Sequence, residues 1–213
     1  MIRTWRGTVV FVVVVAAACA HEGGARRGGI IGQIDAELAG ADETRYAFGG
    51  SGRGQSYDCS GYANQVLRQA APGAFASLRA LRSRPRATEY VERMELGGSD
   101  WRRVARVADL APGDLIAWRH RPDAPRTDAL STGHVAFVVE RPAPAGGGLW
   151  RVRVSDAARS GHSDDTRAPG RSGIGAGTIL VATAPDGAPE AVAWSLRGRF
   201  EVPAAMALGR PLR

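Results

Sequence analysis

The spacing of apolar residues predicts helices in the first half of the chain. Between residues 30 and 41, apolar side chains recur every three or four positions, as they do along one face of a helix. From Cys59 to Ala70 the same spacing predicts a second helix, which Pro72-Gly73 is expected to end. A further short helix is expected from Thr88 to Leu96.

Apolar runs predict strands in the second half of the chain. The run Leu149–Val154 alternates apolar residues with Arg, as a half-exposed strand does. Pro185-Asp186-Gly187 predicts a turn between the runs that end at Thr183 and begin at Ala191. Helices first and strands afterwards predict one α+β domain over residues 30–213, with N-terminal helices packed on an antiparallel sheet of about five strands. The expected strands are Leu115–Trp118, Val135–Val139, Leu149–Val154, Thr178–Thr183 and Ala191–Leu196.

Residues 1–19 have the layout of a secretory signal peptide. Arg3 and Arg6 supply the positive region, and Val9–Val15 is an apolar run too short to cross a bilayer as a mature helix. The small residues before Cys19 also resemble the lipobox of bacterial lipoproteins, in which that cysteine is lipidated. The alternative is an ordinary signal peptide whose cleavage removes Cys19. Residues 20–29 are rich in Gly and Arg and predict a flexible tether, so we expect an exported, periplasmic protein anchored to the outer membrane by lipid.

The amino-acid composition limits the catalytic mechanisms and ligands that this chain could use. All 28 basic residues among the 213 are arginine, so mechanisms that need a lysine amine are excluded. Loss of Arg3 and Arg6 with the signal peptide takes two charges from the net +7 and leaves +5. In an exported protein this charge points to anionic wall or lipid groups rather than to nucleic acid. His120, His134 and His162 lack the spacing of metal ligands, so we expect neither a metal nor a cofactor.

Cys59 is the only free thiol expected in the mature chain, and it begins the expected helix 59–70 directly after a Gly-rich loop. Unpaired N–H groups at a helix N-terminus stabilise an anion, so the thiol is expected to shift toward thiolate. Asp58 can cap this helix, and Gly61 allows another segment to approach closely. The alternative is a small, inert cysteine packed beneath the helix.

Two later residues could complete a site with Cys59. His134 heads an apolar strand and could take the proton of the thiol, although such a histidine is often structural. If the next strand pairs with it through a hairpin over residues 142–148, Asp156 at that strand's end could accept the Nδ1–H of His134. Asp156 could instead cap the loop that follows. His162 could act as a second-shell residue, replace Asp156 as the orienting group, or lie on the loop surface.

The chain resembles the NlpC/P60 cysteine peptidases of bacterial cell walls over residues 30–200 or so. The resemblance rests on five segments in the family's order: RYAFGG, YDCSGYANQVLRQA, LAPGDLIAW, GHVAFVVE and VRVSDAA. The most specific is Asp58-Cys59-Ser60-Gly61, with an aromatic residue before it and an amphipathic helix after it. Departures from the family pattern are Asp156 where His is commoner, an Arg-rich insertion at 73–100 and an extended hairpin at 141–148.

The resemblance implies a papain-like α+β fold with Cys59 as nucleophile, His134 as base and Asp156 as the third residue. It also makes Tyr57, Asp58 and Ser60 candidate contacts for the amine of a substrate. Backbone N–H groups near Cys59 would hold the oxyanion, with Tyr46 nearby.

The leading hypothesis is hydrolysis of peptide bonds in peptidoglycan stem peptides, at the γ-D-glutamyl-diaminopimelate bond, through a thioester. We expect a monomer whose partners are peptidoglycan or muropeptides and, through a lipid anchor, a membrane. An amidase or acyl transferase on the same fold is one alternative. A non-catalytic, lipid-anchored binding protein is the other. A Cys59 that is inert toward a thiol-reactive probe at pH 6 would favour it, because an activated thiolate should react even below the normal thiol pKa.

Overall fold

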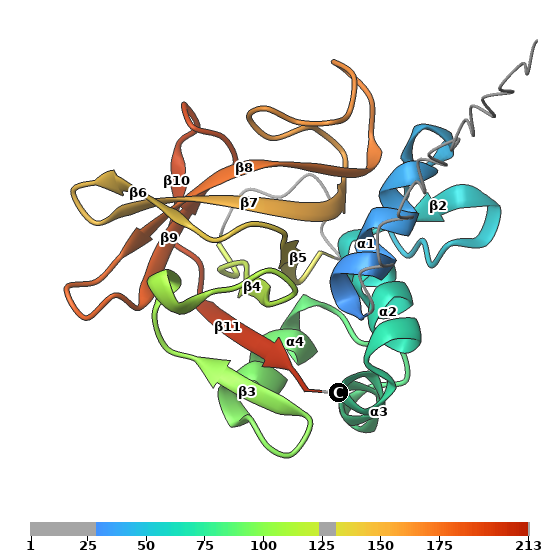
Figure 1. Ribbon diagram of the computed structural model, residues 1–213, viewed down its shortest axis with the longest axis horizontal. Coiled ribbons are helices and arrows are strands. Elements are labelled where there is room, and N and C mark those ends of the chain that lie inside the picture. The colour runs from blue at the N-terminus through green and yellow to red at the C-terminus, as the bar shows by residue number, and fades with distance from the viewer. Residues whose placement is uncertain (1–28, 124–130, 213) are drawn as a thin grey trace, which may run out of the picture.

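The protein is described by a computed structural model that covers residues 29–123 and 131–212 (Figure 1). The signal peptide, Cys19 and the tether up to residue 28 lie outside the described residues. Within the described ranges, no helix is long and apolar enough to cross a bilayer. The helices are α1 (Ile30–Ala39), α2 (Cys59–Ala70), α3 (Pro72–Leu81) and α4 (Ala87–Leu96), with short 3-10 turns η1 (Ala41–Glu43), η2 (Arg53–Gln55) and η3 (Val107–Asp109).

The strands form one large antiparallel sheet and a separate parallel pair. In the large sheet the order is β10-β9-β8-β7-β5-β4-β11-β3, with β6 paired to β7. The α+β class is confirmed, but this sheet has nine strands among the described residues where about five were expected. The strands are β1 (Arg45–Tyr46), β2 (Ser56–Tyr57), β3 (Trp101–Val104), β4 (Leu115–Arg119), β5 (Gly133–Val138), β6 (Ala143–Gly146), β7 (Leu149–Ala158), β8 (Gly173–Thr183), β9 (Pro189–Ala193), β10 (Phe200–Glu201) and β11 (Ala205–Pro211).

Three predicted helices are confirmed, and one helix was missed. The predicted bounds of α2 match the structure, and α1 and α4 differ from their predictions by one or two residues at an end. Pro72 was expected only to end α2, but it also begins α3 at its first helical position. Proline fits there because the first N–H groups of a helix have no partner within it. The 73–100 segment is therefore largely helical, and its apolar side chains Leu78, Tyr90 and Met94 are buried in the core.

The largest correction among the strands concerns β7. This strand was expected to end near Asp156, but it continues to Ala158 and pairs with β8 along its whole length. Asp156 is therefore a buried residue inside a strand rather than a carboxylate at its end. The predicted hairpin connection also contains a strand, because β6 folds back on β7 before the tight turn over residues 146–148.

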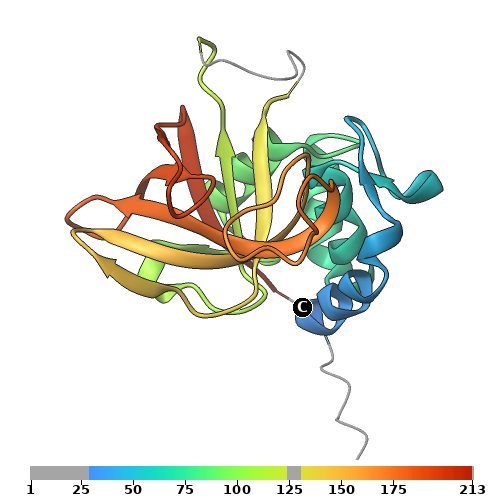
Figure 2. The same ribbon diagram turned by 90° about the horizontal axis from the view of Figure 1, so that it is seen from above.

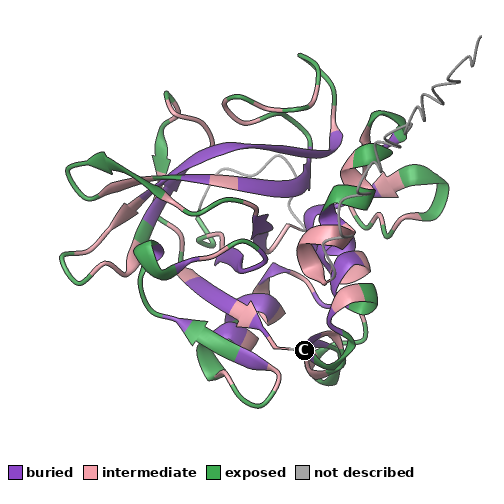
Figure 3. Ribbon diagram, in the orientation of Figure 1, coloured by how far each residue is buried: buried purple, intermediate pink, exposed green. Residues whose placement is uncertain are grey.

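Two apolar cores lie on the two faces of the sheet. All four helices pack their apolar residues on one face, and Figure 2 shows them gathered on one side of the sheet. On the other face, side chains from β4, β5, β7, β8 and β9 pack against one another. The strands β9 and β11 are not neighbours in the sheet, but they approach each other across this face. Because both of its faces are covered, all six residues of β5 are buried (Figure 3).

Gly61 lets the loop before α2 lie directly against the helix, as the sequence predicted. A Cβ atom built on Gly61 would lie 1.9 Å from the carbonyl oxygen of Gly50. That carbonyl also accepts a hydrogen bond from Arg84, so it is not free to move away. The first turn of α2 can therefore sit where it does only with glycine at this position.

Replacing Gly61 with alanine tests this close approach. Alanine normally favours a helix over glycine by about 1 kcal/mol. We expect Gly61→Ala instead to lower the free energy of unfolding by about 1–3 kcal/mol, because the methyl group must displace the Gly50 backbone. Urea unfolding measures this change. The control is Gly40→Ala, where a Cβ meets nothing within 4 Å; a Gly61→Ala protein as stable as the wild type would contradict the packing.

Candidate active site

Cys59 and His134 line the same cavity, which has a volume of about 260 Å³. Cys59 comes from the first turn of α2, and His134 is the second residue of β5. A backbone hydrogen bond from Val135 to the thiol also ties the sulfur to the start of β5. The cavity is completed by Tyr46, Trp118, His120, Ser131, Gly133, Ala158, Arg159, Ser160, Trp194 and Glu201. The start of α2, the start of β5 and several elements distant from them in sequence thus meet at the candidate site.

The thiol of Cys59 is held in its protonated form. Burial raises its pKa to about 12, the adjacent carboxylate of Asp58 adds to this effect, and hydrogen bonds from the Val135 and Ser60 backbone oppose it. This direction is opposite to the shift toward thiolate that a helix N-terminus alone predicts. At about 1.4 kcal/mol for each pH unit, a free thiolate at pH 7 would cost about 7 kcal/mol. A base must therefore remove the proton during any reaction.

Besides burial, Asp58 opposes ionisation of the thiol at the helix end. Its Oδ1 accepts the N–H of Gly61 at 2.6 Å, as an N-cap, and the hydroxyl of Ser60 at 2.9 Å. Its Oδ2 accepts the N–H of Gly49 at 2.8 Å and pairs with Arg84 at 2.7 Å. A carboxylate thus already occupies the positive end of α2.

His134 is fixed by two tryptophan rings and by Asp156. The centroids of Trp118 and Trp194 lie 4.9 Å from that of the imidazole, and Trp118 is its direct partner across β4 and β5. Nε2 of His134 lies 2.6 Å from Oδ2 of Asp156, so Nε2–H is the donor and Nδ1 carries the lone pair. The sequence-based expectation had placed Asp156 on Nδ1. Burial lowers the pKa of His134 and Asp156 only partly offsets this, so the ring is neutral at pH 7.

The carboxylate of Asp156 is fully buried and accepts hydrogen bonds from three side chains. Besides His134, it accepts Nε2–H of His162 at 2.9 Å on Oδ2 and an Nη2–H of Arg167 at 2.9 Å on Oδ1. Burial by itself would raise the pKa of Asp156, but the two histidines together hold it well below its usual range. Asp165 accepts hydrogen bonds from Nε and Nη2 of Arg167, and Nη1 donates to the carbonyl of Gly173. Both carboxylates in this cluster are therefore ionised and paired.

His162 is a cation in this arrangement. Its Nε2 faces the Asp156 carboxylate, and its Nδ1 lies 3.0 Å from the carbonyl oxygen of Trp194. Both partners can only accept, so both ring nitrogens must carry hydrogen. Burial would lower the pKa of His162, but Asp156 outweighs it and the pKa is raised. Of the alternatives left by the sequence, the geometry makes Asp156 the partner of His134 and His162 a partner of Asp156.

The structure brings together most, but not all, of the residues that the sequence singled out. Tyr46 lines the cavity around His134, and also a smaller cleft of about 20 Å³ that Cys59, Asp58 and Ser60 line as well. Tyr57 lines neither; it is buried in the core, with its ring edge-on to Tyr62 at 6.5 Å.

Sequence reasoning did not find the tryptophans around His134 or the buried Arg167. Trp118 could have been found from strand pairing with His134, because the two strands were both predicted. Trp194 falls within the strand predicted over Ala191–Leu196, but the strand β9 ends at Ala193 and Trp194 follows it. Arg167 lies in the loop between β7 and β8, where the sequence predicted no element.

Comparison of the chain with models of protein families, with curated proteins and with solved structures finds no match. Within the described residues, no group of three or more His, Cys, Asp or Glu side chains is arranged to hold a metal ion. The cluster can hold, orient and transfer protons with the chain's own groups.

The state of the Cys59 thiol predicts slow alkylation. At pH 7 we expect iodoacetamide to modify Cys59 at least about a hundredfold more slowly than an unstructured cysteine of pKa about 8.5, because so little thiolate is present. Mass spectrometry of timed samples measures the rate. The same protein unfolded in urea is the control, and equal rates in the two states at pH 6–7 would contradict a buried, protonated thiol.

The charge on His162 predicts a stability change with pH. Because its folded pKa is raised, its contribution is fully present below the unfolded value of about 6.5 and is lost as the pH rises through the folded value. We expect His162→Gln to be less stable than wild type by about 2 kcal/mol at pH 6 and by progressively less above that. Urea unfolding from pH 5.5 to 9 measures the difference. A difference that stays constant throughout would mean that His162 is neutral.

Proposed function

We propose that the protein is a cysteine hydrolase with a papain-like NlpC/P60 fold that cleaves peptide bonds in peptidoglycan stem peptides. The observation that carries the proposal is the convergence of Cys59, His134 and Asp156. The thiol and the imidazole line one cavity, and Nε2 of the imidazole is hydrogen-bonded to the buried carboxylate of Asp156. A nucleophile, a base and an orienting group are the three parts of thiol-dependent acyl transfer.

The proposed first step begins with an uncharged pair. The thiol of Cys59 attacks the substrate carbonyl while its proton passes to Nδ1 of His134, which is the free nitrogen. The charge that develops on His134 lies next to the ionised Asp156, which stabilises it. Proton transfer that accompanies attack avoids a free thiolate, which burial makes costly.

The remaining steps regenerate the enzyme. The imidazolium of His134 donates its proton to the leaving amine, and a thioester with Cys59 remains. His134 then takes a proton from water, and the resulting hydroxide attacks the thioester carbonyl and releases the acid. The imidazolium of His134 returns its proton to the departing sulfur, which restores the thiol. Asp156 is itself held by His162 and Arg167, so it stays ionised throughout the cycle.

The walls of the site suit an acidic, extended substrate. Arg159 lines the larger cavity, with its guanidinium 5.0 Å from the centre of the Tyr46 ring, and Arg86 lines the smaller cleft. Glu201 also lines the larger cavity, and Asp58, which is paired with Arg84, lines the cleft. Arginines in both cavities next to Cys59 match the carboxylates of stem peptides, which are the substrates proposed here. An exported, lipid-anchored monomer would meet this substrate in the periplasm.

The alternatives are an amidase or acyl transferase on the same fold, and a non-catalytic binding protein. Slow labelling of Cys59 does not favour the binding protein, because a protonated thiol is also what the proposed mechanism requires at rest. A direct assay of hydrolysis is therefore needed to distinguish the enzyme from the binding protein.

Digestion of purified sacculi and muropeptides, followed by mass spectrometry, tests the proposal. We expect wild-type protein to cut within the stem peptide, and Cys59→Ala and His134→Ala to lose at least about 10³-fold in rate. Near-UV circular dichroism checks that the variants are folded. Release of whole stems from the sugar would show an amidase instead, and full activity in either variant would overturn the mechanism.

A further inference from the structure

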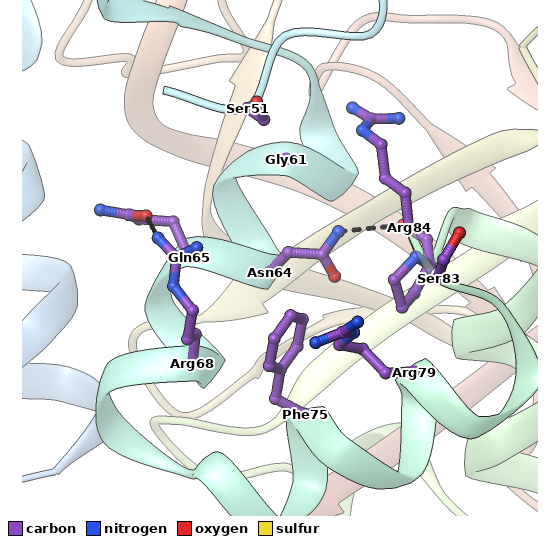
Figure 4. A pocket seen from close by; sticks show the side chains of 10 residues that line it. Ser51, Gly61, Asn64, Gln65, Arg68, Phe75, Arg79, Ser83 and Arg84 are labelled. Carbon is purple, nitrogen blue, oxygen red and sulfur yellow. Dashed lines mark hydrogen bonds between the residues drawn. The ribbon is translucent and has the colours of Figure 1, made fainter. Parts of the chain in front are cut away.

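A second cavity, of about 230 Å³, lies beside α2 away from the candidate active site (Figure 4). Asn64, Gln65 and Arg68 line it from α2, and at about 100° per residue they project roughly half a turn around the helix from Cys59. Phe75 and Arg79 line it from α3, and Arg84 from the loop before α4. None of these residues lines the cavities around Cys59.

The charge of this cavity is strongly positive. Three arginines line it, and its described lining contains no carboxylate. Arg84 is paired with Asp58, but Arg68 bonds only to the amide oxygen of Gln65, and Arg79 has neither a hydrogen bond nor an ion pair within the part of the chain that the structure describes. Figure 4 shows Arg79 pointing toward Phe75 in the middle of the pocket, with Arg68 on one side and Arg84 on the other. Among the residues that the structure describes, the exposed Arg68 and Arg79 thus have no carboxylate partner.

The wall of the cavity is held in place by the fold. Asn64 donates to the carbonyl of Pro85 at 3.0 Å and accepts the hydroxyl of Tyr90 at 2.9 Å, which fixes the loop to α2. Arg84 is anchored to Asp58 and to the Gly50 carbonyl, while its buried Nε has no partner. The concave shape therefore exists before any ligand arrives.

We propose that this cavity binds an oxyanion, the carboxylate or phosphate group of a solute or polymer distinct from the substrate at Cys59. The planar guanidinium fork matches both groups with two parallel hydrogen bonds, which a surface of lysines would not provide. The guanidinium groups of Arg68 and Arg79 supply the charge, and the ring of Phe75 supplies an apolar wall for the attached carbon skeleton.

Direct titration tests the site without any need for hydrolytic activity. We expect inorganic phosphate, citrate or both to bind the wild-type protein in calorimetric titrations at constant ionic strength. The double variant Arg68→Gln/Arg79→Gln should bind about tenfold more weakly or worse, because it loses charge-assisted hydrogen bonds. The matched control is Arg102→Gln/Arg103→Gln, which removes the same charge from exposed positions of β3. Arg84 is left intact because it also holds the cap of α2.

The pattern of binding decides the proposal. Binding of phosphate alone assigns a phosphate group, binding of citrate alone assigns a carboxylate, and a selective loss in the Arg68→Gln/Arg79→Gln protein supports the site in either case. Absence of binding by the wild type overturns it. Equal binding by both double variants also overturns it, because the anion would then respond to overall charge or lie elsewhere. Failure of muropeptide cleavage would leave this result unaffected.

Discussion

The carboxylate of Asp156 has no exposed surface and is hydrogen-bonded to His134, His162 and Arg167. An ionised group can remain there because these three donors, of which His162 and Arg167 are cations, offset its desolvation. Loss of one partner would leave buried polar or charged groups unpaired. The loop between β7 and β8 therefore has to fold back over the sheet, where Asp165 holds both His162 and Arg167. The orientation of His134, and with it the free Nδ1, follows from this arrangement.

The position of Cys59 depends on a different constraint, which is the close packing of α2 against the loop that precedes it. Gly61 admits the Gly50 carbonyl, Asp58 caps the helix, and Arg84 ties both to the loop before α4. The same contacts bury Cys59 and place a carboxylate beside it, which keeps its thiol protonated. Burial thus protects the sulfur at rest and makes its proposed reactivity depend on His134.

Local sequence signals predicted those elements whose residues follow a simple period. The α2 helix was found because its apolar spacing and the capping residue Asp58 agree. The α3 helix was missed because Pro72 both ends one helix and begins the next. The end of β7 was missed because Ser155 and Asp156 are polar, although both are buried by partners from distant segments. The strand β11 contains Gly209 and Pro211 and shows no alternation.

The sequence by itself determined which chemical groups are available: one thiol after residue 19, three histidines among the described residues, and arginine as the only basic side chain besides histidine. It also indicated that Cys59, His134 and Asp156 could meet. Only the tertiary structure decided that Asp156 binds Nε2 of His134, that His162 is charged, and that the pKa of Cys59 rises rather than falls. The reason is physical: tautomers and pKa values depend on burial and on charged neighbours. The burial of Cys59 and the contact between His134 and Asp156 both need segments far apart in the chain to pack together.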